Sequence, residues 1–106
     1  MAADIVDDAE HERLVIERAD GTAELDYRRQ GGRFVVIHTE VPESARGEGL
    51  GGELVQAAVA LAASEGLTLV PLCPYARRWL REHTDEAASV TIDWHVPRRD
   101  DRGSGT

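Results

Sequence analysis

The first third of the chain has a pattern of apolar and polar positions that predicts β-strands. Three segments, separated by glycine-containing turns, carry it: residues 14–18, 22–29 and 33–41. In the second segment Ala23, Leu25 and Tyr27 recur at every other position, so one face of that strand is expected to be buried. The Asp20-Gly21 pair before it is typical of tight hairpins. The pattern therefore predicts an antiparallel meander of three strands, with the third covered on both faces because its centre is entirely apolar.

The middle of the chain changes to a helical period. Leu50, Leu54 and Leu61, with alanines between them, recur at helical spacing and predict an amphipathic helix over residues 49–65 that ends at Gly66. A strand over residues 67–72 follows. Because strand–helix–strand units cross over with a right hand, this strand should lie parallel to the strand before the helix. The remaining predicted elements are a helix over residues 75–83 and an edge strand over residues 89–94.

Length and composition favour one domain. A chain of 106 residues with 42% hydrophobic and 30% charged residues is sufficient for a single modest core. We expect an acidic, flexible lead-in over residues 1–10, a single domain over residues 11–96, and a disordered tail over residues 97–106, which is charged and rich in Gly and Ser.

Charge and cysteine content exclude several classes of protein. The formal net charge of −8 argues against nucleic-acid binding, which normally needs a basic face. One cysteine allows no internal disulfide and no cysteine-based zinc cluster, so we expect no metal. No apolar run reaches membrane length, and the N-terminal residues are acidic where a signal peptide would be basic and then apolar. These features predict a cytoplasmic protein with no membrane partner.

A glycine-dense turn lies between the third strand and the first helix. Gly47, Gly49 and Gly52 match the spacing G-x-G-x-x-G after a strand and before a helix, a pattern found in dinucleotide-binding sites. Backbone N–H groups and the helix dipole at such a turn form a site for phosphate, and glycine lets the anion approach closely. A P-loop is excluded because no Lys-Ser/Thr follows the last glycine. A Rossmann site is disfavoured because residues 70–72 offer no carboxylate for a ribose.

The same turn fits a second pattern. Arg46-x-x-Gly49-x-Gly51 resembles the Arg/Gln-x-x-Gly-x-Gly/Ala loop with which the GCN5-related N-acetyltransferases bind the pyrophosphate of acetyl-CoA. The surrounding sequence, HTEVPESARGEGLGGELVQAAVALAASEGLTLVPLCPYARRWLREH, is similar to the small single-domain, YjdJ-like branch of that family. The resemblance covers about residues 11–84. It implies a minimal version of the family fold, in which the strand before the helix and the strand after it splay apart to admit the cofactor.

The resemblance also implies which residues hold acetyl-CoA. The strand end Thr39, Glu40 and Val41 would pair through its backbone with the pantetheine arm. The glycine loop would bind the pyrophosphate; its residues are Arg46, Gly47, Glu48, Gly49, Leu50, Gly51 and Gly52. A strand N–H near His38 would polarise the thioester carbonyl as an oxyanion donor.

Catalytic residues are implied less directly. Many larger members of the family have N-x-x-A-x-x-L-Y after the second parallel strand, with the tyrosine as general acid. In this chain the Asn position is Cys73 and the Tyr position is Leu80, so that acid is absent. The small branch is associated instead with a cysteine and a histidine, here Cys73 and His38. Cys73 would protonate the CoA thiolate or accept the acetyl group itself, and His38 would activate it or deprotonate the amine. Glu40 is a second candidate base, because it lies on the same strand face as His38.

Other residues near this corner have weaker claims. Tyr75 neighbours Cys73 and could supply a hydroxyl, but we interpret it as a core or rim tyrosine. Arg77 and Arg78 could contact a CoA phosphate, but we interpret them as solvated surface charges. The structural alternatives for Cys73 and His38 are a small buried hydrophobic residue and a half-buried strand histidine.

The function predicted from these residues is acetyl-CoA-dependent N-acetyl transfer to an amine, either a small molecule or a protein. One alternative is a domain that binds CoA or acetyl-CoA without turnover, motivated by the missing tyrosine. Another is a nucleotide-binding fragment, which NAD or ATP would stabilise. We expect a monomer or a weak dimer.

Overall fold

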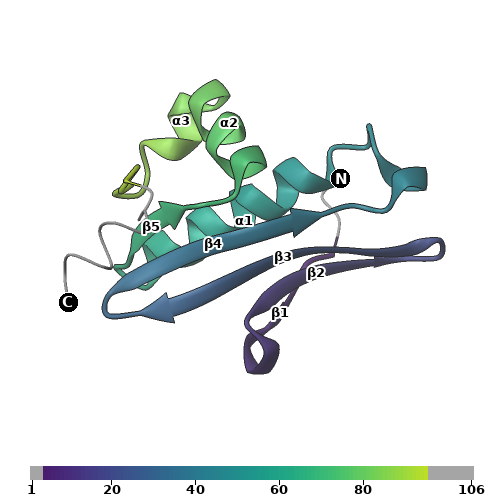
Figure 1. Ribbon diagram of the computed structural model, residues 1–106, viewed down its shortest axis with the longest axis horizontal. Coiled ribbons are helices and arrows are strands. Elements are labelled where there is room, and N and C mark those ends of the chain that lie inside the picture. The colour runs from purple at the N-terminus through teal and green to yellow at the C-terminus, as the bar shows by residue number, and fades with distance from the viewer. Residues whose placement is uncertain (1–3, 96–106) are drawn as a thin grey trace, which may run out of the picture.

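The computed structural model describes residues 4–95 and has an α/β fold with one mixed sheet (Figure 1). The five strands lie side by side in chain order: β1 (Val6–Asp8), β2 (Arg13–Arg18), β3 (Gly21–Gln30), β4 (Arg33–Glu40) and β5 (Thr68–Pro71). Neighbours from β1 to β4 are antiparallel, and β5 is parallel to β4. The predicted meander and parallel crossover are therefore confirmed.

Three α-helices accompany the sheet: α1 (Leu50–Ser64), α2 (Pro74–Glu82) and α3 (Thr84–Ala87). Short 3₁₀ turns, η1 (Ala9–His11) and η2 (Glu43–Ala45), follow β1 and β4. Helix α1 packs on β2 to β5 across one face of the sheet, α2 contacts β4 and β5, and α3 packs against α1 and α2 (Figure 1). The two main helices agree with the predicted ones to within about one residue at each end, whereas α3 was not predicted.

The core lies between α1 and the sheet. Alternate residues of the strands are buried there, and Leu25, Tyr27 and Phe34 are completely inaccessible to solvent. The rings of Tyr27 and Phe34 stack with centroids 4.5 Å apart. The helix contributes Leu54 and Ala58, both fully buried, and its small alanines let it pack closely on the strands. The apolar face of the strands, which repeats every two residues, thus packs in one layer against the apolar face of α1, which repeats every 3.6 residues.

A β-bulge interrupts the pairing of β3 with β4. Tyr27 pairs with Val36, whereas the preceding Asp26 pairs with His38, so Ile37 is an extra residue without a partner. Because side chains alternate between faces, this insertion moves His38 from the helix-covered face to the open one. The prediction that β4 is covered on both faces is wrong at this point, since Ile37 is 41% exposed.

The parallel strands β4 and β5 separate after a short ladder. Their register ends at Val36 opposite Pro71, and the N–H groups of Leu72 and Cys73 both donate to the Val36 carbonyl, at 2.9 and 3.2 Å. Beyond this point β4 continues to Glu40 while the chain after β5 turns into α2. The splayed strands expected from the resemblance are therefore present.

Two local predictions are corrected. Residues 6–8 were placed in a flexible lead-in but form β1, because Val6 pairs with Val15 at the edge of the sheet. The edge strand predicted over residues 89–94 is reduced to one parallel bridge between Ile92 and Leu69. Three residues of the lead-in, 1–3, and the predicted tail, residues 97–106, lie outside the described residues. Within residues 4–95, every helix is too short or too polar to cross a membrane.

Candidate functional site

A cavity of about 740 Å³ opens where β4 and β5 separate. Its walls are the end of β4, the glycine loop, the first turn of α1 and the start of α2. The lining residues are His38, Thr39, Glu40, Val41, Ala45, Arg46, Gly47, Gly49, Leu50, Gly51 and Tyr75. Eight of the ten residues expected to bind the cofactor therefore line one cavity, and Glu48 and Gly52 do not.

The loop before α1 is held by the tip of the β2–β3 hairpin. Ser44 donates a hydrogen bond to Asp20 at 2.5 Å, and this bond lowers the pKa of the Asp20 carboxyl. Arg18 pairs with Glu48, also at 2.5 Å. These contacts fix the loop from outside. They also pair the Glu48 carboxylate, one of the two carboxylates between β4 and α1, which would otherwise repel an anion.

The N-terminal end of α1 offers unsatisfied backbone donors. Gly47 and Gly49 have φ angles of +93° and +82°, in the left-handed region that glycine adopts without strain. Gly49 is the N-cap and supplies no side-chain hydrogen bond. Among the described residues, no acceptor is found for the N–H groups of Leu50, Gly51 and Gly52. Such a helix end carries partial positive charge and suits an anion.

The two helical glycines have a different structural reason. A Cβ on Gly51 would lie 2.8 Å from the Tyr75 hydroxyl oxygen, and one on Gly52 would lie 2.5 Å from Nε1 of Trp79. Trp79 is itself stacked on His83, with ring centroids 4.0 Å apart. Gly51 and Gly52 are therefore required for close packing of α2 against the first turn of α1, whatever binds there.

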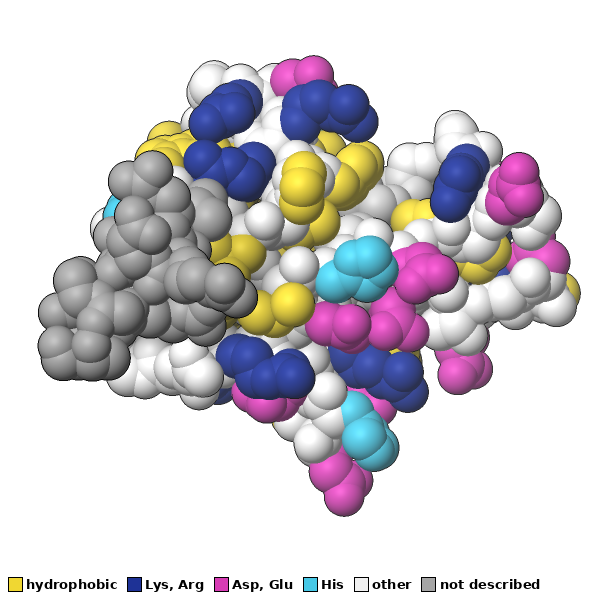
Figure 2. Space-filling view, viewed as in Figure 1, with side chains coloured by type: hydrophobic (Ala, Val, Ile, Leu, Met, Phe, Trp, Pro, Cys, Tyr) yellow, Lys and Arg dark blue, Asp and Glu magenta, His cyan; other side chains and the backbone are white. Residues whose placement is uncertain are grey.

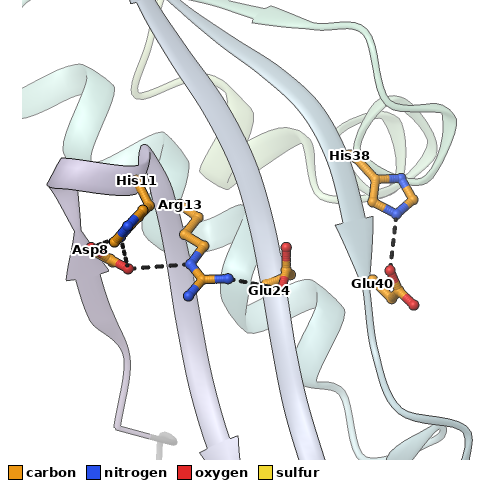
Figure 3. A network of polar contacts seen from close by, with 6 residues as sticks. All are labelled: Asp8, His11, Arg13, Glu24, His38 and Glu40. Atoms are coloured by element: carbon orange, nitrogen blue, oxygen red, sulfur yellow. Dashed lines mark hydrogen bonds and ion pairs between the residues drawn. The ribbon is translucent and has the colours of Figure 1, made fainter.

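His38 lies on the open face of the sheet with several acidic groups. It contacts Glu40 at 3.4 Å (Figure 3). In the β3–β4 ladder His38 is opposite Asp26, and Glu40 is opposite Glu24. A hydrogen bond with Asp26 and burial raise the pKa of Glu24. Arg13 contacts Glu24 and Asp8 but not His38 (Figure 3). In Figure 2 a histidine lies beside a group of acidic side chains on this face.

Cys73 lies below the cavity rather than on its wall. It is 3% exposed, and its Sγ donates to Oγ1 of Thr39 at 3.5 Å. Thr39 lines the cavity because the bulge turns it toward the helix side, opposite Leu25. The hydrogen bonds thus pair Cys73 with Thr39 and His38 with Glu40, and no described contact joins Cys73 to His38. Leu80, at the position of the family tyrosine, is buried in the core.

Tyr75, interpreted from the sequence as a core or rim tyrosine, lines the cavity opposite β4. Its signal was its place at the start of a helix directly after the splayed strand. Arg78 lies over the Tyr75 ring at 5.9 Å. Arg77 turns away and donates to the carbonyls of Pro71 and Trp94, both at 3.0 Å, so its contacts are structural.

Within residues 4–95 no three His, Cys, Asp or Glu side chains are grouped closely enough to hold a metal ion. The cavity combines a helix end whose free N–H groups suit an anion, a strand edge left by the splay, and ionisable groups at its rim and floor. Such a set can bind an extended molecule with a phosphate at one end.

Comparison with known proteins agrees with this geometry. A family model described as GCN5-related N-acetyl-transferase matches residues 12–90. No match is found among curated proteins. A solution NMR structure of a GCN5-like candidate N-acetyltransferase from Staphylococcus aureus superposes with a TM-score of 0.67 and 21% identity, over 91% of this chain and 95% of that one. At this identity the structural match shows the shared fold.

Proposed function

The chain belongs to the GCN5-related N-acetyltransferase family, and from this premise we propose that it transfers the acetyl group of acetyl-CoA to an amine. The observation that carries the proposal is the cavity between the open N-terminal end of α1 and the splayed end of β4. Its two halves suit the two halves of acetyl-CoA, a charged diphosphate and a thin amide-containing arm.

The diphosphate is assigned to the α1 end. Leu50, Gly51 and Gly52 have N–H groups without described acceptors, and Arg46 lines the same part of the cavity. The pairing of Glu48 with Arg18 neutralises one negative charge beside these donors. The acidic total is therefore no obstacle, because binding depends on local donors.

The pantetheine arm is assigned to the end of β4. Residues Thr39, Glu40 and Val41 line the cavity, and β5 ends before it reaches them. The edge of β4 at these residues is therefore available to the amide groups of a bound arm, as it would be to another strand.

The chemistry proposed is attack of a neutral amine nitrogen on the thioester carbonyl. The C–N bond forms, the C–S bond breaks, the amine loses a proton and the CoA thiolate gains one. His38, with Glu40 beside it at 3.4 Å on the exposed rim, is proposed as the base. Cys73 is proposed as the thiol at the floor, either as proton donor or as acetyl acceptor, with Thr39 between it and the cavity.

Steady-state release of CoA tests the function. Purified protein is incubated with acetyl-CoA and a panel containing spermidine, lysine, a lysine-bearing peptide and arylamines, and free thiol is followed with time. We expect release that depends on both acetyl-CoA and one class of amine, and that falls at least tenfold in His38→Gln. Thermal stabilisation by acetyl-CoA without release for any amine would favour a binding domain, the alternative suggested by Leu80.

Intact mass after incubation with acetyl-CoA separates the two roles of Cys73. A gain of one acetyl group in the wild type but not in Cys73→Ala supports a covalent route. Turnover without a mass gain supports direct transfer. Stabilisation by ATP or NAD instead of acetyl-CoA would contradict the proposed function.

A further inference from the structure

The hydroxyl of Tyr75 is a polar group directed at the first turn of α1. Its oxygen and the adjoining ring carbons lie 2.8–2.9 Å from the position that a Cβ on Gly51 would take, so the ring edge rests on the helix backbone. The residue lines the cavity. Among residues 4–95, no hydrogen-bond partner of this hydroxyl is found, in contrast to the hydroxyl of Tyr27, which donates to Asp7 at 2.6 Å.

The ring is held in this place from two sides. Gly51 leaves room for it on α1, and the guanidinium of Arg78, one turn further along α2, lies over its face. A half-buried donor that is fixed in position and has no partner in the described chain suits a partner supplied by a ligand.

We propose that Tyr75 is a cofactor-binding residue whose hydroxyl donates a hydrogen bond to the diphosphate of acetyl-CoA at the first turn of α1. The inference rests on the proposed function and extends it. The backbone loop supplies donors that any phosphate would accept, whereas Tyr75 adds a side-chain donor from α2 beside the first turn of α1. Tyr75 thereby selects thioesters that carry the diphosphate over shorter ones.

The protonation state suits this role. Burial raises the pKa of the Tyr75 phenol, and the positive charge of Arg78 opposes that rise only in part. The phenol therefore keeps its proton at neutral pH and acts as a donor. A hydrogen bond from a neutral hydroxyl to a charged oxygen is typically strong enough to change affinity about tenfold.

Tyr75→Phe tests the proposal with two ligands, acetyl-CoA and S-acetylpantetheine, which lacks the diphosphate. Dissociation constants are measured by NMR titration of the folded proteins. We expect acetyl-CoA to bind about tenfold more weakly to the variant and S-acetylpantetheine to bind unchanged. The matched control is Tyr27→Phe, the same chemical change at the only other tyrosine, for which neither affinity should change.

The outcomes separate this inference from the proposed function. Unchanged acetyl-CoA binding in Tyr75→Phe overturns the inference alone, and so does equal weakening for both ligands, which would indicate a role near the thioester. Absence of acetyl-CoA binding in the wild type overturns the proposed function as well. A measurement without any variant follows the ¹³Cζ resonance of Tyr75, which should move with acetyl-CoA and remain in place with S-acetylpantetheine.

Discussion

The two ends of α1 differ in whether the described chain supplies hydrogen-bond partners for their terminal backbone groups. At the C-terminal end, Gly66 has φ +68°, its N–H donates to Ala63, and the N–H of Leu67 donates to Ala62. The guanidinium of Arg29 donates two hydrogen bonds of 2.8 Å to the carboxylate of Glu65. At the N-terminal end, Gly49 also has a positive φ, yet no side chain of residues 4–95 caps the helix, and a cavity lies in front of it.

The difference indicates where binding can occur. Orphan backbone groups at a helix end must find partners in the chain, in water or in a ligand. At Gly66 the chain provides them through a Schellman motif. At Gly49 the described part of the chain provides room and a fixed loop but no acceptor. The same kind of glycine therefore marks a closed end in one case and a candidate site in the other.

The largest expected effect comes from Gly52→Ala, which disturbs the packing behind the open end. The new Cβ would lie 2.5 Å from Nε1 of Trp79, and stacking on His83 restrains the indole from moving away. Overpacking of this kind costs about 2 kcal/mol, which exceeds the gain in helix propensity. Urea unfolding measures the loss. Trp79→Phe in the same chain should recover part of it, and simple additivity of the two changes would contradict the packing explanation.

Gly49→Ala and Gly66→Ala compare the two ends directly. Both glycines have left-handed φ angles and open space where a Cβ would be, so each variant should lose about 1 kcal/mol of stability from backbone strain alone. Only Gly49→Ala should weaken acetyl-CoA binding, by about tenfold, because only that end is proposed to meet the diphosphate. Calorimetric titration checks this, and equal affinities for the two variants would contradict the assignment.

Arg29→Ala removes the side chain that pairs with Glu65 at the C-terminal end of α1. The guanidinium pairs with Glu65, lies 5.1 Å from the Tyr27 ring centroid and donates to the Tyr27 hydroxyl. Its loss should lower the melting temperature by about 5 °C, the shift expected for roughly 1 kcal/mol in a domain of this size. Acetyl-CoA affinity should remain that of the wild type. A variant that kept its melting temperature but bound acetyl-CoA more weakly would contradict a purely structural role for this end of α1.

The smallest effect is a pH dependence at the closed end. The hydrogen bonds from Arg29 lower the pKa of Glu65. Stability from this pair is therefore fully present above the unfolded value of about 4.3 and is lost as pH falls through the lower folded value. Glu65→Gln should flatten the stability profile in this acid range. If the unfolding free energy of the variant depended on pH as steeply as that of the wild type, other carboxyl groups would be responsible for the acid dependence.

Local patterns were sufficient for most of the fold. Alternation at Leu25 and Tyr27, the Asp20-Gly21 turn and the stop at Gly66 are short-range features, and each gave the correct element. Strand β1 was missed because Val6 and its neighbours lack a pattern of their own and are ordered only by pairing with β2. Residues 89–94 show the converse. Their apolar residues alternate as in a strand, yet only Ile92 pairs with the sheet, through a single bridge.

The site was less accessible to prediction from the sequence. Eight of the loop and strand residues implied by the resemblance line the cavity, and a short local motif was sufficient to name them. The bulge at Ile37 turns His38 to the open face and Thr39 to the helix side, the reverse of simple alternation after Val36. It follows from pairing with β3 and has no signature in the sequence of β4. The contact of Gly51 with Tyr75 joins residues that only the tertiary fold brings together. The burial of Cys73 under Thr39 likewise depends on how the two strands separate.

An amide NMR titration of uniformly ¹⁵N-labelled protein with acetyl-CoA tests the central claim most directly. Gly47, Gly49, Gly51 and Gly52 report on the open end of α1, and Gly66 reports on the closed end of the same helix. The proposed function predicts large shifts for the first four amides and none for Gly66. Saturable shifts that leave the first four amides unmoved, or no shifts at all, would contradict the claim that this helix end binds the cofactor.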